Sequence, residues 1–289
     1  ILNMLQGYAL ETLNAVDRVH FVVEAMRRAY RDRARYLGDP DQVELPLRRL
    51  LNPEYALGVS SDIRLDCHTP SAQLGQPGAP ATACAAGPAT EGEVQEGTDT
   101  THFSIIDRQG NRVAATLSIN YPFGAGFVPP GTGILLNDEM DDFSAKPGVP
   151  NVYGLVGAEA NAIAPGKRML SSMSPTFIEG PERVAILGTP GGSRIISMVL
   201  LAALEFIDGK GPEAWVTRPR FHHQYLPDRI SFEPDALSPE TQRDLAAKGH
   251  RLQPLDDTYG NLQGVMWSRR SGEVSAASDP RGLGLAATE

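Results

Sequence analysis

Apolar side chains recur at helical spacing in the first forty residues. From Val16 to Leu37 they repeat every three or four positions, which draws one continuous stripe on a helix. The pattern stops at Gly38-Asp39-Pro40, a sequence typical of a helix end. The arginines of this segment lie mostly off the stripe, are expected on a solvated face and are assigned no function; they are Arg27, Arg28, Arg31 and Arg33.

After residue 100 the pattern changes to strands. Residues 101–106 and 112–120 are rich in β-prone residues and flank Asp107-Arg108-Gln109-Gly110-Asn111, a loop with the Gly and Asn that a hairpin needs. An antiparallel hairpin centred near Gln109 places Thr100 opposite Ser118, within two residues. The sequence therefore predicts that these two hydroxyls are neighbours.

Further strands and helices follow. Residues 176–179 and 183–187 predict a second hairpin across Gly180-Pro181, which leads through a Gly-rich turn into a helix over about 194–207. Ser238-Pro239 predicts the start of another helix, which ends near Gly249. Residues 265–267 and 274–276 are expected to be closing strands.

Residues 66–99 have the composition of an exposed, mobile connector, with four prolines, several glycines and the acidic stretch EGEVQEGTD. Two cysteines, Cys67 and Cys84, lie within it. They could close a loop by a disulfide, which would suit a periplasm or another oxidising compartment, or they could remain free thiols. Both alternatives stay open from the sequence.

The overall composition favours a small-molecule partner. The chain has 289 residues, of which 41% are apolar, and a net charge of -9 without a basic cluster, which argues against nucleic acid and anionic membranes as partners. The longest apolar run, Met198 to Ile207, has ten residues and contains Glu205, too short to span a bilayer. The sequence begins at Ile1 without a signal segment, so any signal peptide is expected to lie outside it.

Thr100 stands where the acidic connector meets the first strand. A threonine that opens a strand is ordinary, but an N-terminal threonine can act as a nucleophile with its own α-amine as the base. That amine is free only if the Asp99-Thr100 bond is cut. We therefore expect autocleavage, in which the Thr100 hydroxyl attacks the Asp99 carbonyl and water hydrolyses the resulting ester.

The other requirements of such a nucleophile occur downstream. Gly191 and Gly192, at a strand-to-helix turn, offer two unobstructed N–H groups to an oxyanion, although a glycine pair is also ordinary turn chemistry. Glu139 and Asp142, three residues apart, could share one helical face and hold an ammonium group. The serines Ser171-Ser172 could donate to a carboxylate.

Metal-binding alternatives lack the required spacing. The acidic stretch around Glu139 and Asp142 could also be a solvated turn or a divalent-metal loop, but it lacks the ligand spacing of a calcium loop. His222-His223 have no HExxH companion and are expected to be structural. The sequence therefore predicts neither a metal nor a cofactor.

Five successive blocks of the chain carry a family resemblance. They are TTHFSIIDRQGNRVAATLSIN, GILLNDEMDDFSAKPGVPNVYGLVG, PGKRMLSSMSPT, GTPGGSRI and PRFHHQYLPD, and in this order they resemble the signature blocks of gamma-glutamyltransferases, or glutathione hydrolases. The resemblance implies an α+β fold, a four-layer αββα sandwich of the N-terminal-nucleophile hydrolase type. It also implies a zymogen, with residues 1–99 as the end of a large subunit and residues 100–289 as a small subunit, which form a heterodimer after cleavage.

The resemblance also implies the roles of individual residues. Thr100 would be the nucleophile, Ser118 its hydrogen-bonding partner, and Gly191 and Gly192 the oxyanion site. The substrate would be glutathione or another gamma-glutamyl amide, with water, an amino acid or a dipeptide as acceptor, in a periplasmic or secreted protein. Its binding residues would be Asn120, Glu139 and Asp142 at the α-amino group, Ser171 and Ser172 at the α-carboxylate, and Tyr153 in a lid over 147–165.

Two departures and two alternatives accompany this interpretation. The family has a threonine where this chain has Ser118, which is expected to slow activation, and the family's carboxylate-binding arginine would precede Ile1. One alternative is a cephalosporin or glutaryl acylase of the same fold, against which the ammonium-binding pair Glu139 and Asp142 argues. The other is an unprocessed, inactive protein that acts as a structural module.

Overall fold

The computed structural model describes residues 1–74, 100–151 and 153–289. The chain divides into two compact units, and each draws on several stretches of the sequence. The first unit consists of Ile1–Val94, Asp141–Leu170 and Phe221–Asp256. The second unit consists of Gln95–Met140, Ser171–Arg220 and Asp257–Glu289. Each unit is described by itself.

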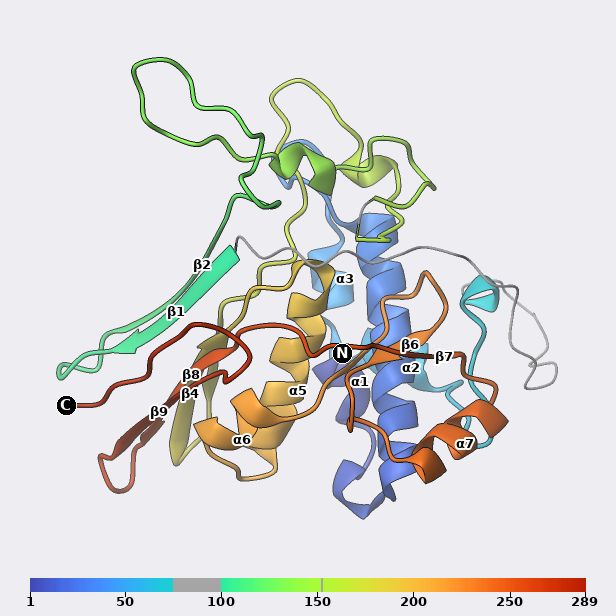
Figure 1. Ribbon diagram of the computed structural model, residues 1–289. Helices are drawn as coiled ribbons and strands as arrows, with labels where there is room; N and C mark the ends of the chain where they lie inside the picture. Colours follow the sequence, from blue (N-terminus) through green and yellow to red (C-terminus); the bar gives the residue numbers. More distant parts are fainter. Residues whose placement is uncertain (75–99, 152) are drawn as a thin grey trace. The chain divides into compact units, whose positions relative to one another are not determined.

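The first unit is mainly helical (Figure 1). Its helices are α1 (Leu2–Leu5), α2 (Ala15–Tyr36), α3 (Leu47–Leu50), α4 (Pro53–Ser60) and α7 (Pro239–Ala247). A small sheet of order β5-β6-β7 holds Phe221–His222, Ile230–Phe232 and Leu252–Pro254. The predicted helix start at Ser238 is confirmed, because its side chain accepts a hydrogen bond from the Thr241 N–H.

Helix α2 is the predicted amphipathic helix, and it packs against α1, α4 and α7. The predicted apolar stripe is buried at Val23, Met26 and Tyr30. The prediction for the arginines was wrong, because Arg27 and Arg28 are only 1% and 0% exposed. Carboxylates inside the unit balance their charges, and some of these carboxylates are distant in sequence. A local pattern of polar positions does not reveal such pairing.

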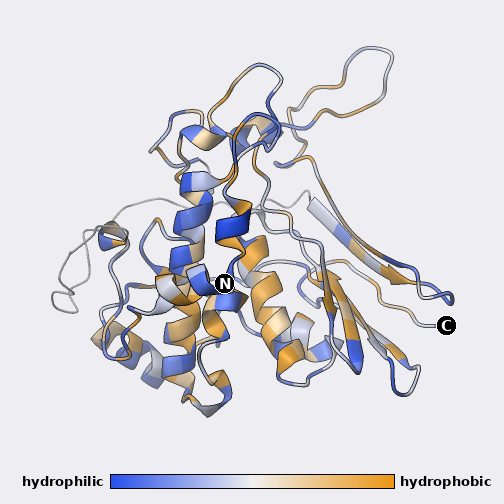
Figure 2. Ribbon diagram, turned by 180° about the vertical axis from the view of Figure 1, so that it is seen from behind, coloured by the Kyte–Doolittle hydropathy of each residue, from blue (hydrophilic) through white to orange (hydrophobic). Residues whose placement is uncertain are grey.

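The second unit contains a four-stranded antiparallel sheet of order β3-β4-β8-β9. Its strands are β3 (Thr176–Glu179), β4 (Arg183–Gly188), β8 (Gln263–Ser268) and β9 (Val274–Ser278). The predicted second hairpin and closing strands are therefore confirmed. Helices α5 (Ile195–Ile207) and α6 (Pro212–Thr217) pack on this sheet, and the apolar colour of α5 in Figure 2 reflects its burial along nearly its whole length.

The predicted first hairpin is also present. Strands β1 (Thr100–Ile106) and β2 (Arg112–Ser118) lie side by side (Figure 1) and pair antiparallel. Their register places Thr100 opposite Ser118. Both strands contact β4, and β1 also contacts β8. Within the second unit, the helices, the four-stranded sheet and the hairpin thus form three successive layers.

Two further expectations concern the connector and the membrane. Cys67 takes part in a disulfide bond, whereas Cys84, Asp99 and most of the predicted connector lie outside the described residues. Among the residues that the structure describes, no helix combines the length and the apolar character needed to cross a bilayer.

Candidate active site

The hydroxyl of Thr100 has a defined hydrogen-bonding partner. Because Thr100 and Ser118 are directly opposite across the hairpin, their side chains meet on one face, and Thr100 Oγ1 lies 2.9 Å from Ser118 Oγ. Ser118 Oγ also accepts a hydrogen bond from the Asn120 N–H at 2.9 Å. Since one hydroxyl can accept and donate at once, Ser118 can hold Thr100 while it is itself fixed by the backbone.

Asn120 owes this position to an unusual backbone conformation. Its φ is 72°, in the left-handed region where asparagine is among the few tolerated side chains. The side chain is buried, and its Nδ2 donates to the Asp138 carbonyl at 3.4 Å. The chain therefore turns sharply directly after the strand that carries Ser118.

Gly191 and Gly192 form the turn between β4 and the helical segment that continues into α5. Both have positive φ, 137° and 53°, which favours glycine. A Cβ on Gly191 would lie only 2.5 Å from Met198 Cε. Because Gly191 is the N-cap and Gly192 the first residue of this segment, their N–H groups have no acceptor within the helix and can donate to an anion.

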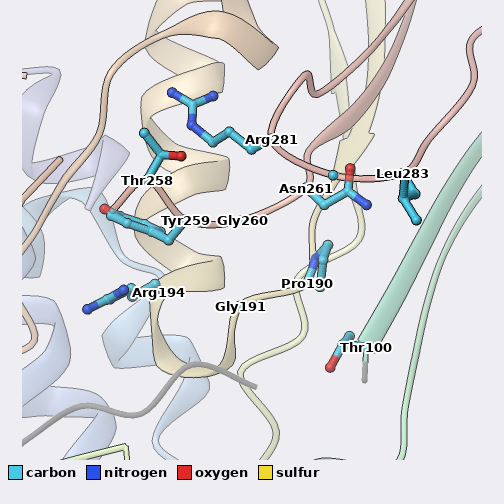
Figure 3. Close-up of a pocket in the computed structure, with 11 residues that line it drawn as sticks. Thr100, Pro190, Gly191, Arg194, Thr258, Tyr259, Gly260, Asn261, Arg281 and Leu283 are labelled. Atoms are coloured by element: carbon cyan, nitrogen blue, oxygen red, sulfur yellow. The ribbon is translucent and has the colours of Figure 1, made fainter. Parts of the chain in front are cut away.

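Thr100 and Gly191 line the same cavity, which has a volume of about 370 Å³. Figure 3 shows Thr100 at the start of β1, beside the turn that carries Pro190 and Gly191. The structure thus brings the predicted nucleophile and one predicted oxyanion donor to one cavity. Both lie within the second unit.

The same cavity has polar walls that the sequence did not single out. The Arg194 guanidinium lies over the ring of Tyr259 at 4.4 Å from its centroid, and both residues line the cavity (Figure 3). On the other wall, the N–H of Asn261 donates to Thr189 Oγ1 at 3.3 Å, and Thr189 Oγ1 donates to the Pro190 carbonyl at 2.8 Å. The block GTPGGSRI contained a signal for Arg194, since this arginine lies two residues after the glycine pair, at the start of the predicted helix.

Glu139 and Asp142 lie in one 3₁₀ turn, Glu139–Asp142, in which side chains three apart share a face. The predicted common face is therefore present. Glu139 Oε1 is buried and has no hydrogen-bond partner among the described residues. A buried carboxylate oxygen without a donor is costly, so this atom is suited to receive a donor from a ligand.

The two predicted carboxylate-binding serines precede β3. Ser171 is exposed, and its Oγ accepts from the Met173 N–H at 3.1 Å, while Ser172 is buried. Tyr153 belongs to the first unit, where it is 3% exposed and its carbonyl accepts from Gln224 Nε2 at 2.8 Å. The substrate roles of these three residues stay predictions.

The adjacent histidines have hydrogen-bonding partners within the first unit. His222 Nε2 pairs with Gln224 Oε1 at 2.8 Å, and His223 lies 3.2 Å from Asp228 Oδ1. Over the described ranges, no group of three or more His, Cys, Asp or Glu side chains is placed to hold a metal ion.

The chain is similar to known proteins over most of its length. The family model described as "Gamma-glutamyltranspeptidase" matches residues 1–288. The chain belongs to the gamma-glutamyltranspeptidase family. It is 46% identical over 272 residues to the glutathione hydrolase proenzyme of Pseudomonas sp. (strain A14). That match covers 92% of this chain and 45% of the relative. It is also 42% identical over 287 residues to the glutathione hydrolase proenzyme of Escherichia coli (strain K12). That match covers 98% of this chain and 47% of the relative.

The solved structures agree with this membership and show the fold. Gamma-glutamyltranspeptidase from Pseudomonas nitroreducens, complexed with L-DON, is 45% identical with a TM-score of 0.60, over 65% of this chain and 99% of that chain. Cephalosporin acylase from Bacillus halodurans is 24% identical with a TM-score of 0.72, over 97% of this chain and 46% of that chain, which shows likeness of fold alone. The fold is α+β, of the N-terminal-nucleophile hydrolase type, as predicted. The chain spans about half the length of the curated relatives that it matches.

Proposed function

We propose that this chain is the catalytic part of a gamma-glutamyltransferase, which hydrolyses or transfers the gamma-glutamyl group of glutathione and related amides. The observation that carries this proposal is the Thr100–Ser118 hydroxyl pair, of which Thr100 lines a cavity together with Gly191. The curated relatives named above are glutathione hydrolase proenzymes, which supports both the substrate class and a processed precursor.

Activation begins with cleavage of the Asp99-Thr100 bond. Thr100 Oγ1 attacks the Asp99 carbonyl, the peptide rearranges to an ester, and water hydrolyses it to leave Thr100 with a free α-amine. Residues 100–289 make up 190 of the 289 residues, about two thirds. The matched chain of the Pseudomonas nitroreducens structure has this size, because 99% of it corresponds to 65% of the present chain. This agreement supports a small subunit that begins at Thr100.

The cleaved pieces remain one heterodimer. The first unit contains residues from both sides of the cleavage point, and within it α2 packs against α7. Arg27, before the cleavage point, forms a buried ion pair with Asp228, after it. The core of this unit therefore holds the two subunits together without a covalent bond. No metal or cofactor takes part in the proposed reaction.

The mature amine then acts as the base for Thr100 Oγ1, which attacks the gamma-carbonyl of the donor. The N–H groups of Gly191 and Gly192 stabilise the oxyanion, a contribution of roughly 2.7–4 kcal/mol for one such donor. The amine leaving group takes the proton and departs, and a gamma-glutamyl ester on Thr100 remains. Water, an amino acid or a dipeptide then accepts the gamma-glutamyl group.

The donor's amino-acid head group is bound at the remaining predicted residues. Asn120, Glu139 and Asp142 hold the α-ammonium group, Ser171 and Ser172 receive the α-carboxylate, and Tyr153 belongs to the covering lid. The buried, unpartnered Oε1 of Glu139 supports an ammonium ligand. A disulfide at Cys67 supports a periplasmic or secreted location, where thiols are oxidised.

The test of the nucleophile uses the Thr100→Ala variant. Incubation of the wild-type protein is expected to give two fragments on a denaturing gel, one with Thr100 as its new N-terminus, whereas Thr100→Ala stays intact and inactive. Hydrolysis by the uncleaved Thr100→Ala variant would contradict the role of Thr100. An intact, inactive wild-type protein would favour a structural module.

The test of the substrate class compares gamma-glutamyl-p-nitroanilide with its glutaryl analogue, which lacks the α-ammonium group. The wild-type protein should prefer the gamma-glutamyl compound. Glu139→Gln should reduce that preference by raising KM for the gamma-glutamyl donor, because it removes the charge that faces the ammonium group. A preference for the glutaryl compound would instead favour an acylase.

A further inference from the structure

His102 lies beneath the proposed nucleophile on the inner face of the hairpin. Side chains alternate along a strand, so Thr100, His102 and Ser104 share one face of β1. The ring of His102 is 5% exposed, while its neighbours Phe103 and Ile105 are 42% and 49% exposed on the opposite face. In the middle of this strand, His102 and Ser104 therefore face inward, whereas Phe103 and Ile105 face outward.

Both ring nitrogens of His102 are occupied by hydroxyls. Nδ1 lies 2.8 Å from Thr116 Oγ1, on the residue directly opposite in β2, and Nε2 lies 3.0 Å from Ser104 Oγ. Burial lowers the pKa of His102 to about 4, so the ring is neutral at physiological pH. With both nitrogens engaged, His102 is not available as a base for Thr100.

The ring also packs directly against the backbone of β4. A Cβ added to Gly188, the last residue of β4, would lie 2.8 Å from His102 Nε2 and closer still to Nδ1 and Cε1. Only glycine therefore fits where the ring meets the strand. Three residues later the same stretch of chain reaches Gly191, at the cavity beside Thr100.

We propose that His102 is a positioning residue, which acts as a spacer between the strand that begins at Thr100 and the turn that carries Gly191 and Gly192. This role rests on the function proposed above for Thr100. Through its contact with Gly188, the ring sets the separation between the hairpin and the four-stranded sheet. Its hydrogen bond to Thr116 fixes the His102–Thr116 pair, which is two residues along the hairpin from Thr100 and Ser118. It touches neither the substrate nor the reacting atoms.

The test combines His102→Ala with Gly188→Ala. His102→Ala is expected to lower kcat for gamma-glutamyl-p-nitroanilide by about 100-fold, the loss that a misplacement of about 1 Å can cause, with little change in KM because the head-group residues are untouched. Gly188→Ala alone should have a similar effect, since its methyl group displaces the ring. In the double variant, Gly188→Ala should lower kcat little below that of His102→Ala, because the methyl group enters the space that the ring has left.

The matched control is Phe103→Ala, on the same strand but on the exposed face, which should keep wild-type kcat. His102→Gln, which retains a donor and an acceptor, should recover part of the loss. It also keeps the inference testable if His102→Ala does not fold. Wild-type kcat in His102→Ala, a change confined to KM, or fully additive effects in the double variant would each overturn the inference.

A second measurement does not depend on turnover. Crystal structures of the wild-type protein and of His102→Ala, or His102→Gln where that is the folded variant, should show a changed distance between Thr100 Oγ1 and Gly191 N. An unchanged distance would overturn the inference even if activity fell. If the wild-type protein shows no cleavage or hydrolysis, the proposed function fails, and this distance alone decides the role of His102.

Discussion

At the scale of single residues, the partner of Thr100 can be tested first. Ser118→Ala removes the hydroxyl that lies 2.9 Å from Thr100 Oγ1. A hydrogen bond of this kind contributes about 0.5–1.5 kcal/mol, so the rates of cleavage and of donor hydrolysis should fall by about twofold to tenfold. N-terminal sequencing over time and steady-state assays measure the two rates.

The control for this change is Ser118→Thr, which retains the hydroxyl and adds a methyl group that restricts χ1. It should cleave at least as fast as the wild-type protein. If Ser118→Ala were as fast as Ser118→Thr, the hydroxyl pair would have no part in activation.

Gly191 carries the second prediction at this scale. Gly191→Ala forces a side chain into a positive-φ conformation and against Met198 Cε, which moves the turn that offers the oxyanion donors. We expect kcat to fall by about 100-fold or more. Gly272→Ala is the matched control, since it is also at positive φ but has open space around it. Equal losses in both variants would assign the effect to backbone strain alone.

The sequence predicted that Thr100 and Ser118 are neighbours, but not which residues support them. Thr100 and Ser118 were predicted as neighbours because a short loop fixes the register of a hairpin. His102 was missed, although the alternation of polar and apolar residues in its HFSI segment, residues 102–105, contained a signal. That alternation defines two faces but does not say which face is inward. Only the packing against Gly188 shows that the polar face is the buried one.

At the scale of elements, the hairpins and long helices could be predicted, whereas the polar interior of the first unit could not. Periodicity and caps located α2, α5 and α7 closely. The burial of Arg27 depends on Asp228, which is 201 residues away in sequence. Burial alone would raise the pKa of Glu24, but Arg27 and Arg28 outweigh this effect and hold it well below its usual range. Such pairing over long sequence distances leaves no periodic signal.

Arg27 therefore carries a prediction about stability. Arg27→Met removes the cationic partner of Asp228, which keeps only the neutral His223 ring and the Ser71 N–H, and one of the two arginine partners of Glu24; it also removes the donor to Ser71 Oγ at 2.9 Å. Leaving a buried charge without its partner costs about 3–5 kcal/mol, so thermal unfolding should shift down by at least about 6 °C. Differential scanning calorimetry measures this shift.

Arg48→Met is the control in the same unit, because Arg48 is exposed. It should change stability by no more than about 0.5 kcal/mol. Equal midpoints for the two variants would show that the ion pairs of Arg27 do not stabilise the first unit.

At the scale of the whole molecule, buried histidines occur in both units. Burial lowers the pKa of His102, in the second unit, to about 4. In the first unit, burial and then the charge of Arg27 lower the pKa of His223 to about 4, against the opposing effect of Asp228. Both rings are neutral in the folded protein at pH 7.

These histidines predict a loss of stability in mild acid. Between pH 6.5 and 4 the unfolded chain binds protons at these positions and the folded chain does not, so the free energy of unfolding falls as the pH is lowered. The difference between pKa values of 6.5 and about 4 corresponds to about 3 kcal/mol for each histidine at pH 4. The carboxylates with lowered pKa values, such as Glu24 and Asp228, lose their contribution only at lower pH.

Urea unfolding at a series of pH values tests this expectation, because the histidines of the unfolded chain begin to bind protons at a higher pH than its carboxylates. The free energy of unfolding should decline from pH 6.5 to about pH 5.5, before the unfolded carboxylates, whose ordinary pKa values are about 3.9 to 4.3, begin to bind protons. His102→Gln has no titrating ring at this position. Its free energy of unfolding should therefore fall less steeply with pH than that of the wild-type protein, by the contribution of about one bound proton, whatever its stability at pH 7. The same slope in the wild-type protein and His102→Gln would mean that His102 is protonated in the folded state. In that case its ring could not accept a hydrogen bond from either hydroxyl, and the contact with Gly188 would have to hold the two layers alone.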